Sequence, residues 1–357
     1  MFTQIDRGEC HTVLGLKARG LDFEVICDPQ AARRSILRDA GIVVHELPLQ
    51  HRFDRTAINA LRRRLESGAF DIVHVFTKIA LSNTLRASKG MPVRIVAYRG
   101  IVGNLSFLDP LSWASFLNPR VDRIICVCEA IRRYFLNMRF LWLRVPPEKV
   151  VTIYKGHRLE WYQQEAQPDL ATIGIPNGAP VIGCVARMRP RKGIDVLVRA
   201  FDRLPEQLGA HLVLLGRGQD KTIDRAIAAS PRRDRIHVLG FRPEAAALVG
   251  GFDVFVLPSL RREGLPRAVI EAMAQGIAPI VTDSGGSPEL VQDRVSGRVV
   301  PAGDEGALTE ALEELLLDRD KRLKYGRAAQ RRIRDDFNVE RTVHETMRVY
   351  QELMAQG

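Results

Sequence analysis

Short apolar runs alternate with helical segments along the chain, and this alternation constrains the fold more than any other feature of the sequence. The clearest unit is Val254–Leu257, four apolar residues typical of a buried strand. A loop follows, and then a helical pattern that Pro266 opens and Gly276 ends. Strands that alternate with helices are characteristic of a parallel sheet with helices on both faces. The sequence therefore predicts an α/β fold.

The alternation occurs in two successive series, and 357 residues are enough for two domains of ordinary size. We predict tandem doubly wound, Rossmann-like domains over residues 1–155 and 156–335. A C-terminal helix at 336–357 is expected to pack back on the first domain. A polar stretch at 155–177 is interpreted as a linker, and one helix of the second series is predicted at 243–249.

The N-terminal series does not open on a confident strand, although α/β domains usually do. Residues 1–5 are short, so the first strand is expected to be short or missing. A loop at 6–9 is expected to lead into a helix at 10–19. Further on, the apolar segment 101–119 carries Trp113. This segment is either a mobile lid or acceptor-binding element, or a helix packed on the domain.

The positive charge lies in the first half of the chain. The net charge is +11, and residues 1–155 hold 24 Lys and Arg against 14 Asp and Glu. Such an excess favours an anionic partner: a membrane surface, a nucleic acid or a phosphorylated substrate. We expect no nucleic-acid partner, because the sequence has neither aromatic stacking patches nor a nucleic-acid-binding motif.

Two further features bear on location. No run approaches 18 consecutive apolar residues, so no transmembrane helix is predicted. The five cysteines are scattered and odd in number, which favours reduced thiols and a cytoplasmic protein.

Two carboxylates follow the Val254–Leu257 run. Glu263 is in the loop after the predicted strand, and Glu271 lies about two turns along the next helix. Ligands of open α/β sheets bind at the carboxyl ends of the strands. Both carboxylates could accept hydrogen bonds from sugar hydroxyls. Solvated surface charges are the alternative for both.

Cations and glycines follow other predicted strands. Arg187 and Lys192 come after the strand at 180–186, before a helix, which makes an anion site for a phosphate or pyrophosphate. Gly216, in a Gly-Arg-Gly turn, is weak evidence for a nucleotide. Gly285 and Gly286 offer backbone N–H groups for another anion cradle, or form a tight turn without a ligand.

Several short motifs follow one another along the chain, and both their order and their spacing are informative. These are Ala186-Arg187…Arg191-Lys192-Gly193, Leu215-Gly216-Arg217-Gly218, Leu239-Gly240-Phe241, Pro258-Ser259…Glu263-Gly264-Leu265-Pro266, Glu271–Gly276, Ser284–Val291 and Gly297–Pro301. With them the chain resembles the retaining glycosyltransferases of family 4, most specifically over residues 180–310. The resemblance implies the GT-B fold, in which two Rossmann-like domains face a cleft. It also implies transfer of a sugar from a nucleotide-sugar donor to an acceptor with retention of configuration, without a metal or other cofactor.

The resemblance further implies a role for each matching residue in binding the donor. Arg187 and Lys192 would hold the diphosphate and neutralise the leaving group, and Glu263 would bind the sugar hydroxyls. The remaining donor contacts would come from the backbone of Gly264 and Leu265, from Glu271 at the ribose, from Gly240 and Phe241 at the base, and from Gly216, Gly285 and Gly286.

The N-terminal domain departs from the family pattern at two positions. The first loop has Arg7-Gly8 in place of Gly-Gly, and Gly8 is the expected donor contact. Arg99 stands where the family has a histidine near the donor sugar. Arginine also pairs well with phosphate or carboxylate, so we interpret Arg99 as a catalytic cation with altered substrate contacts.

The expected acceptor is a glycan, a lipid-linked or a phosphorylated molecule, bound by the basic N-terminal domain in surface polysaccharide or lipopolysaccharide synthesis. The protein is then cytoplasmic, or peripheral on the inner face of the cytoplasmic membrane. Alternatives left open are an inactive or divergent nucleotide-sugar binding protein and a GT-B nucleotide-sugar epimerase.

Overall fold

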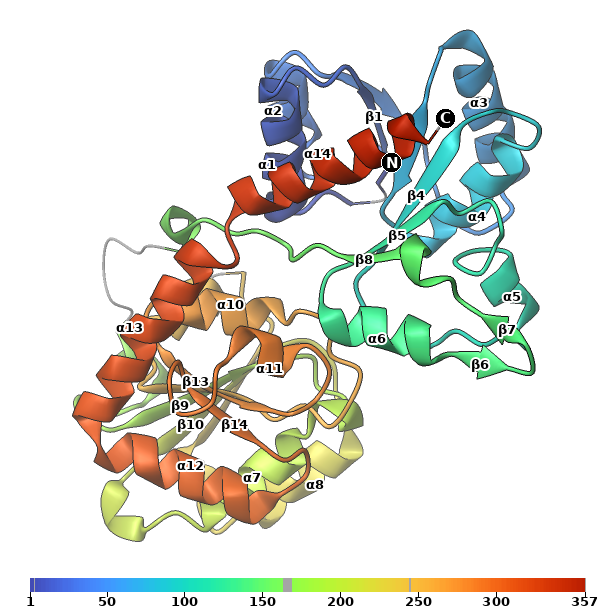
Figure 1. The fold of residues 1–357 in the computed structure, drawn as a ribbon. Helices are drawn as coiled ribbons and strands as arrows, with labels where there is room; N and C mark the ends of the chain where they lie inside the picture. The colour runs from blue at the N-terminus through green and yellow to red at the C-terminus, as the bar shows by residue number, and fades with distance from the viewer. Residues whose placement is uncertain (3, 163–168, 244, 357) are drawn as a thin grey trace. The chain divides into compact units, whose positions relative to one another are not determined.

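The computed structural model describes residues 1–2, 4–162, 169–243 and 245–356, which form two compact units (Figure 1). Unit 1 is Met1–Gly156 together with Phe337–Gly357, and unit 2 is His157–Asp336. Residues 163–168 of the expected linker, and residue 244 of the helix expected at 243–249, lie outside the described residues. The described part of that helix is Ala245–Val249.

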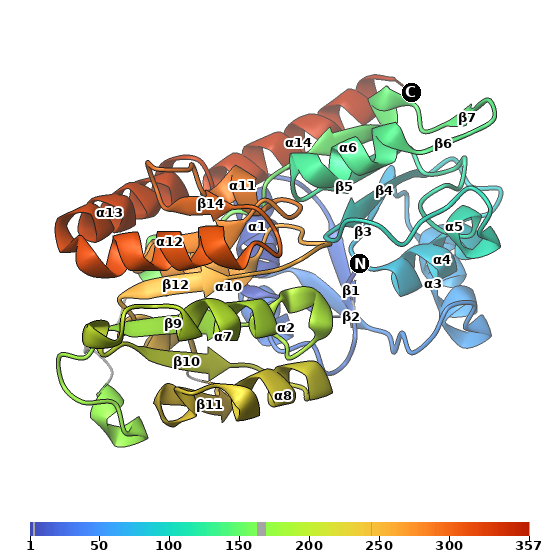
Figure 2. The same ribbon diagram turned by 90° about the horizontal axis from the view of Figure 1, so that it is seen from below.

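Unit 2 is a parallel α/β unit. In its described residues, six strands form one sheet in the order β11-β10-β9-β12-β13-β14, every pair parallel (Figure 2). The chain order reverses between β9 and β12, which are hydrogen-bonded neighbours although β10 and β11 intervene in sequence. The strands are β9 (Val181–Val185), β10 (His211–Leu215), β11 (Ile236–Gly240), β12 (Val254–Leu257), β13 (Ala278–Thr282) and β14 (Arg298–Val300).

Helices cover this sheet because each presents an apolar stripe. In α7 the stripe includes Ile194, Leu197 and Phe201, all fully buried, and the helix packs against α8 and α12. The core therefore lies between the sheet and its helices. The helices of unit 2 are α7 (Ile194–Asp202), α8 (Lys221–Ala229), α9 (Ala245–Val249), α10 (Arg267–Ala274), α11 (Ser287–Leu290), α12 (Glu305–Leu317) and α13 (Arg319–Asp335).

Unit 1 contains two separate parallel sheets where the sequence predicts one doubly wound sheet. The described strands β1 and β2 form one sheet, and the other has the order β3-β4-β5-β8. An antiparallel hairpin, β6–β7, stands apart. The strands are β1 (Glu24–Cys27), β2 (Val43–Glu46), β3 (Ile72–Val75), β4 (Arg94–Arg99), β5 (Arg123–Cys126), β6 (Arg139–Phe140), β7 (Leu143–Arg144) and β8 (Val150–Thr152).

The first helix of unit 1 begins at Arg7, three residues before the predicted start, so the prediction that 6–9 is a loop is wrong. The reason is a capping box, in which the Asp6 carboxylate accepts from the Glu9 N–H and the Glu9 carboxylate accepts from the Asp6 N–H. Gly8 is therefore in the first helical turn. The helices of unit 1 are α1 (Arg7–Ala18), α2 (Arg34–Asp39), α3 (Arg55–Ser67), α4 (Lys78–Ala87), α5 (Pro110–Trp113), α6 (Glu129–Asn137) and α14 (Val339–Ala355).

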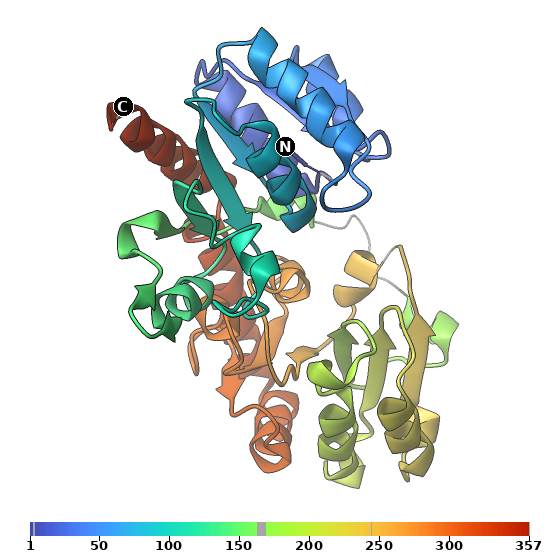
Figure 3. The same cartoon turned by 90° about the vertical axis from the view of Figure 1, so that its right-hand side faces the viewer.

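The C-terminal helix α14 belongs to unit 1 and packs against α1 (dark red in Figure 3). The contact is close, since a Cβ at Gly15 would lie 2.6 Å from a methyl group of Val343. In the apolar segment 101–119, α5 is the helical part, and the Trp113 Nε1–H donates to the Phe107 carbonyl at 2.8 Å. Of the helices described, none is both long and apolar enough to span a lipid bilayer.

Candidate functional site

The reversal of strand order in unit 2 brings three loops together. Since β9, β12 and β13 are parallel neighbours, the segments that follow them leave the same edge of the sheet. Hydrogen bonds join these segments: the Leu260 backbone N–H donates to the Arg191 carbonyl at 2.9 Å, and the side-chain hydroxyl of Thr282 donates to the Ser259 carbonyl at 2.5 Å. In such sheets, ligands usually bind at the carboxyl ends of the strands, at the point where the strand order reverses.

A buried ion pair lies at this edge. The Lys192 Nζ is 2.5 Å from the Glu263 Oε1, and the two side chains are 12% and 8% exposed. The Ser259 hydroxyl donates to the same oxygen at 2.6 Å. No bond to Oε2 of Glu263 is found among the described residues, so that oxygen can accept from a ligand. The pair thus presents a cation and a carboxylate together.

The glycines of the site let backbone segments approach where a side chain would collide. Gly285 has φ +61°, and a Cβ there would lie 2.1 Å from the Glu263 carbonyl oxygen. Gly216 has φ +148°, and its Cβ would lie 1.7 Å from the Ala186 carbonyl oxygen. Real Cβ atoms do not come this close, so both positions require glycine for the loops to meet.

Two buried hydroxyls flank the glycine turn. The Oγ atoms of Ser284 and Ser287 have no hydrogen-bond partner in the described part of the chain. A buried hydroxyl without a partner costs free energy, which indicates that a ligand or water completes the site. Neither serine is among the site residues predicted from the sequence. The Ser-Gly-Gly-Ser run directly after a strand was the signal that could have found them.

Glu271 lies on α10 and is buried, with Arg267 Nε 2.7 Å from its Oε1. A second group of residues follows β10 and β11, where Gly216 N–H donates to the Gly240 carbonyl at 2.8 Å. There the Arg217 guanidinium carbon lies 3.7 Å from the centroid of the exposed Phe241 ring. A flat cation over an aromatic ring forms a ledge suited to a planar ligand.

All predicted donor residues except Gly8 belong to unit 2, and the structure divides those of unit 2 between these two groups. Arg187 is exposed and lies two residues after the end of β9. The group after β9, β12 and β13 holds Lys192, Glu263, Gly264, Leu265, Gly285 and Gly286, with Glu271 along α10; the group after β10 and β11 holds Gly216, Gly240 and Phe241.

Arg99 and Gly8 belong to unit 1. Arg99 ends β4 and is 5% exposed. Its Nε donates to the Ile101 carbonyl at 3.1 Å, a terminal nitrogen donates to the Gly103 carbonyl, and its guanidinium carbon lies 4.8 Å from the centroid of the Phe116 ring. Burial lowers the pKa of this guanidinium. The N–H groups of Arg99 thus donate to carbonyls of the loop that directly follows β4. Gly8 packs against the segment that follows β8, and a Cβ there would lie 3.1 Å from the Gly156 carbonyl oxygen.

No group of three or more His, Cys, Asp or Glu side chains with metal-binding geometry occurs among the residues with described positions. The ionic groups of the site are therefore the arginines, the lysine and the carboxylates named above.

Comparison with known proteins supplies the family. The sequence model described as glycosyl transferases group 1 matches residues 167–332, and the one described as Glycosyltransferase Family 4 matches residues 10–161. A lipopolysaccharide core biosynthesis mannosyltransferase of Rhizobium leguminosarum bv. viciae is 32% identical over 198 residues, 54% of this chain and 56% of that protein. A putative colanic acid biosynthesis glycosyltransferase of Escherichia coli (strain K12) is 35% identical over 164 residues, 43% of this chain and 40% of that protein. The chain thus matches about half the length of these curated relatives.

Solved structures resemble the chain over nearly its whole length. A glycosyltransferase from Rickettsia africae superposes with a TM-score of 0.82 at 18% identity, over 100% of this chain and 98% of that one. Anabaena HepE in complex with UDP-glucose gives a TM-score of 0.75 at 21% identity, over 98% of each chain. At these identities the likeness establishes the fold, which is GT-B with two Rossmann-like domains.

Proposed function

Because the chain belongs to glycosyltransferase family 4, we propose that it transfers a sugar from a nucleotide-diphosphate donor to an acceptor with retention of anomeric configuration. The observation that carries this proposal is the buried Lys192–Glu263 pair at the strand-order reversal of unit 2. Cleavage of a sugar–phosphate bond builds negative charge on the leaving diphosphate, and a preorganised cation stabilises that charge as it develops.

In the proposed complex, the Lys192 ammonium and the Arg187 guanidinium form ion pairs with the donor diphosphate. The Glu263 carboxylate then accepts hydrogen bonds from the hydroxyls of the sugar. The unpartnered Ser284 and Ser287 hydroxyls and the backbone N–H groups of the glycine turn complete the anion site. Cations meet the diphosphate charge directly, so we propose that no metal is required. Further donor contacts in this proposal come from the backbone of Gly264, Leu265, Gly285 and Gly286.

The rest of the nucleotide has two proposed contacts. Glu271, held by Arg267, accepts from the ribose hydroxyls. The base lies on the ledge of Arg217 and Phe241, beside Gly216 and Gly240. A solved structure of Anabaena HepE contains UDP-glucose, which supports a nucleotide-sugar donor for a protein of this fold.

The proposed role of the enzyme is in the synthesis of surface polysaccharide or lipopolysaccharide. Support comes from the names of two relatives: the Rhizobium leguminosarum protein is named for lipopolysaccharide core biosynthesis, and the Escherichia coli protein is named as a putative enzyme of colanic acid biosynthesis. We propose a glycan, lipid-linked or phosphorylated acceptor bound by the basic unit 1. The same unit carries Arg99, proposed as a catalytic cation, and Gly8, proposed as a donor contact.

Donor screening followed by product analysis tests this function. A panel of UDP-, GDP-, ADP- and dTDP-sugars is screened for thermal stabilisation of the protein, and the stabilising donor is then incubated with candidate glycan acceptors. The anomeric proton coupling in the NMR spectrum of the product is expected to match that of the donor. An inverted product contradicts retention. Conversion of the donor sugar without an acceptor indicates an epimerase, and tight donor binding without transfer or hydrolysis indicates a binding protein.

We propose in addition that the protein lies on an anionic membrane surface, as a lipid-linked acceptor would require. The supporting feature is the β6–β7 hairpin, where Leu141 and Trp142 are 70% and 81% exposed. Arg139 and Arg144 lie opposite each other across the hairpin. Residues 132–149 hold five Lys and Arg against one Asp or Glu. An aromatic tip between cations suits the boundary between lipid headgroups and acyl chains.

The hairpin can be tested by sedimentation with liposomes. The double substitution Leu141→Ser and Trp142→Ser is expected to weaken binding to phosphatidylglycerol liposomes by about tenfold or more, because each buried side chain contributes about 1.5–3 kcal/mol. Val238→Ser, which removes an exposed apolar side chain of unit 2, is the matched control and is expected to bind normally. Absence of liposome binding by the unaltered protein at low salt would contradict the membrane proposal.

A further inference from the structure

Three cations of unit 1 have no ion-pair partner in the described part of the chain, and the proposed function gives a role to only one of them, Arg99. Arg99 is the last residue of β4, and Lys78 is the first residue of α4, shortly after the end of β3. Since β3 and β4 are parallel neighbours, both residues lie at the edge formed by the carboxyl ends of the strands. Ligands of open α/β sheets bind at that edge.

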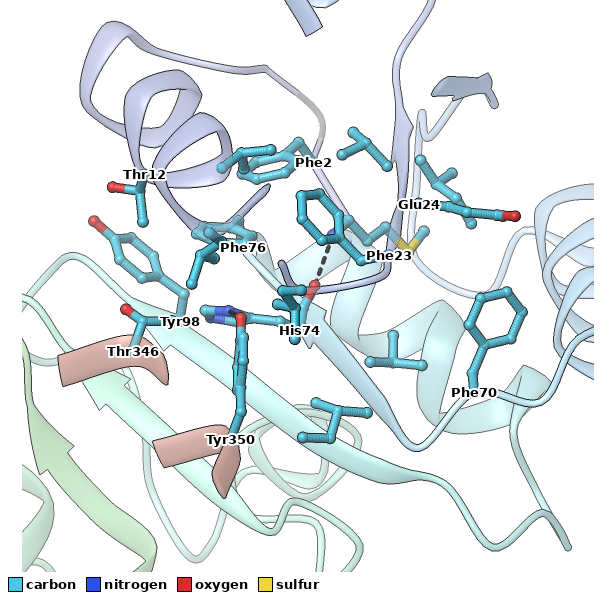
Figure 4. Close-up of a pocket in the computed structure, with 18 of the residues that line it drawn as sticks. Phe2, Thr12, Phe23, Glu24, Phe70, His74, Phe76, Tyr98, Thr346 and Tyr350 are labelled. Carbon is cyan, nitrogen blue, oxygen red and sulfur yellow. Dashed lines mark hydrogen bonds between the residues drawn. The ribbon is translucent and has the colours of Figure 1, made fainter. Parts of the chain in front are cut away.

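The cations are separate from the largely apolar cavity of unit 1. His74 of β3 and Tyr98 of β4 line that cavity, which has a volume of about 510 Å³ (Figure 4). Successive side chains of a strand point to opposite faces of the sheet, so Arg99 points away from the face that carries Tyr98. Lys78 and Arg52 are also not among the residues that line the cavity. The three cations therefore form a polar group of their own.

Arg52, the third cation, lies in the loop before α3. Its Nη1 is buried and has no hydrogen-bond partner among the residues with described positions. The loop is held against α4, because the Asn83 side-chain amide donates to the His51 carbonyl at 3.1 Å and the Arg86 guanidinium carbon lies 3.7 Å from the centroid of the Phe53 ring. Phe53 has φ +69°, which is unusual for a bulky residue. The fold thus fixes a buried guanidinium nitrogen in place without giving it a partner.

The three cations repel one another. Burial lowers the pKa of the Lys78 ammonium, the guanidinium groups of Arg52 and Arg99 lower it further, and Asp109 raises it. The Asp109 carboxylate caps α5, and the Ser112 hydroxyl donates to it at 2.8 Å. Three cations beside one carboxylate leave an excess of two positive charges. Like charges that lie close together destabilise a protein unless an anion joins them.

We propose that Arg52, Lys78 and the first turn of α4 form a subsite for a phosphate group carried by the acceptor. This subsite rests on the proposed glycosyltransferase function and narrows its acceptor to a phosphorylated molecule. A phosphate monoester carries about two negative charges near neutral pH, which match the excess of two positive charges better than one carboxylate does.

The donors for the phosphate oxygens are in place. They are the Arg52 Nη1, the Lys78 ammonium and the backbone N–H groups of Lys78 and Ile79, none of which donates to a group in the described part of the chain. Arg99 adds its charge, since two of its nitrogens already donate to carbonyls of the loop after β4.

Calorimetric titration of the full chain with inorganic phosphate tests the subsite. The background is the double substitution Lys192→Met and Glu263→Gln, which removes the proposed diphosphate cation of unit 2, so that the remaining phosphate binding is expected in unit 1. In this background, Lys78→Met and Arg52→Gln are each expected to weaken phosphate binding by about tenfold or more.

Two variants are matched controls, and both are expected to bind phosphate normally. Lys89→Met removes an exposed cation just beyond the other end of α4, and Arg55→Gln removes one from the first turn of α3. An equal loss in these controls, or undiminished binding in Lys78→Met and Arg52→Gln, would overturn the subsite. Without phosphate, Lys78→Met is expected to unfold at the same or a higher temperature, because repulsion is relieved. A lower midpoint would contradict the absence of a partner for Lys78.

Transfer assays then identify the source of the phosphate. Arg52→Gln is expected to lower the preference for a phosphorylated acceptor over its phosphatase-treated form by about tenfold or more, as a ratio of kcat/KM values. Inhibition of transfer by a soluble sugar phosphate supports a phosphate on the glycan, and inhibition by phosphatidic acid vesicles alone supports a lipid phosphate. Inhibition by neither would overturn the subsite. Phosphate binding without any transfer would contradict the proposed glycosyltransferase function, whereas transfer without phosphate binding would contradict the subsite alone.

Discussion

Replacing Lys192 by methionine is expected to lower kcat/KM for sugar transfer by about 100-fold or more, the usual effect of removing one group that stabilises developing negative charge. The substitution also leaves the buried Glu263 carboxylate without its cation, 2.5 Å away in the native protein. Breaking a buried pair from one side costs about 3–5 kcal/mol of unfolding free energy. Steady-state kinetics and urea unfolding measure the two effects separately.

Two variants separate catalysis from stability. Arg189→Met removes an exposed cation from the same loop and is expected to change kcat/KM by about threefold or less. The double substitution Lys192→Met and Glu263→Gln removes both charges, so it is expected to recover much of the lost stability without recovering activity. Near-normal activity of Lys192→Met, or an equal loss in Arg189→Met, would remove Lys192 from the proposed donor site.

Replacing Gly285 by alanine is expected to destabilise unit 2 and to lower donor affinity about tenfold or more. The backbone at Gly285 has φ +61°, and the added methyl group would meet the Glu263 carbonyl oxygen at 2.1 Å. Because backbone atoms lie on both sides of the contact, the loop carrying Glu263 must move. Donor titration by calorimetry and chemical unfolding are the measurements.

Gly240→Ala is the matched control for stability. Gly240 has nearly the same backbone angle, φ +66°, but no atom within 4 Å of a Cβ. Its alanine variant is expected to be destabilised only by the strain of a left-handed alanine, about 1 kcal/mol. We expect Gly285→Ala to cost at least about 2 kcal/mol more than this control. Equal costs would show that the Glu263 loop accommodates the methyl group, contrary to the close approach in the structure.

Local sequence signals predicted most of the donor unit. Val254–Leu257 is a strand as expected, and α10 follows it from Arg267. The loops at strand ends could be identified because apolar runs, prolines and glycines act over a few residues. The sequence could not show that Lys192 and Glu263, 71 positions apart, form an ion pair. The sequence also could not show which hydroxyls lack a hydrogen-bond partner. The ion pair and the unpartnered hydroxyls both depend on how the loops pack.

Unit 1 was predicted less well, for related reasons. The start of α1 was placed too late because the Asp6–Glu9 capping box was not considered. The single predicted sheet is divided, because strand periodicity does not specify which edges pair. Arg99 was predicted as a catalytic cation because it stands where the family has a histidine near the donor sugar. The structure adds its bonds to the Ile101 and Gly103 carbonyls, and its catalytic role stays a prediction.

The sequence by itself determined the alternation of strands and helices, and with it the family and the residues that stand at strand ends. Only the tertiary structure decided that β9 and β12 are neighbours, which unites the loops of Lys192, Glu263 and Gly285. The physical reason is that strand pairing depends on contacts between residues far apart in the chain. Periodicity and turn chemistry describe each element but not the order in which strands join a sheet.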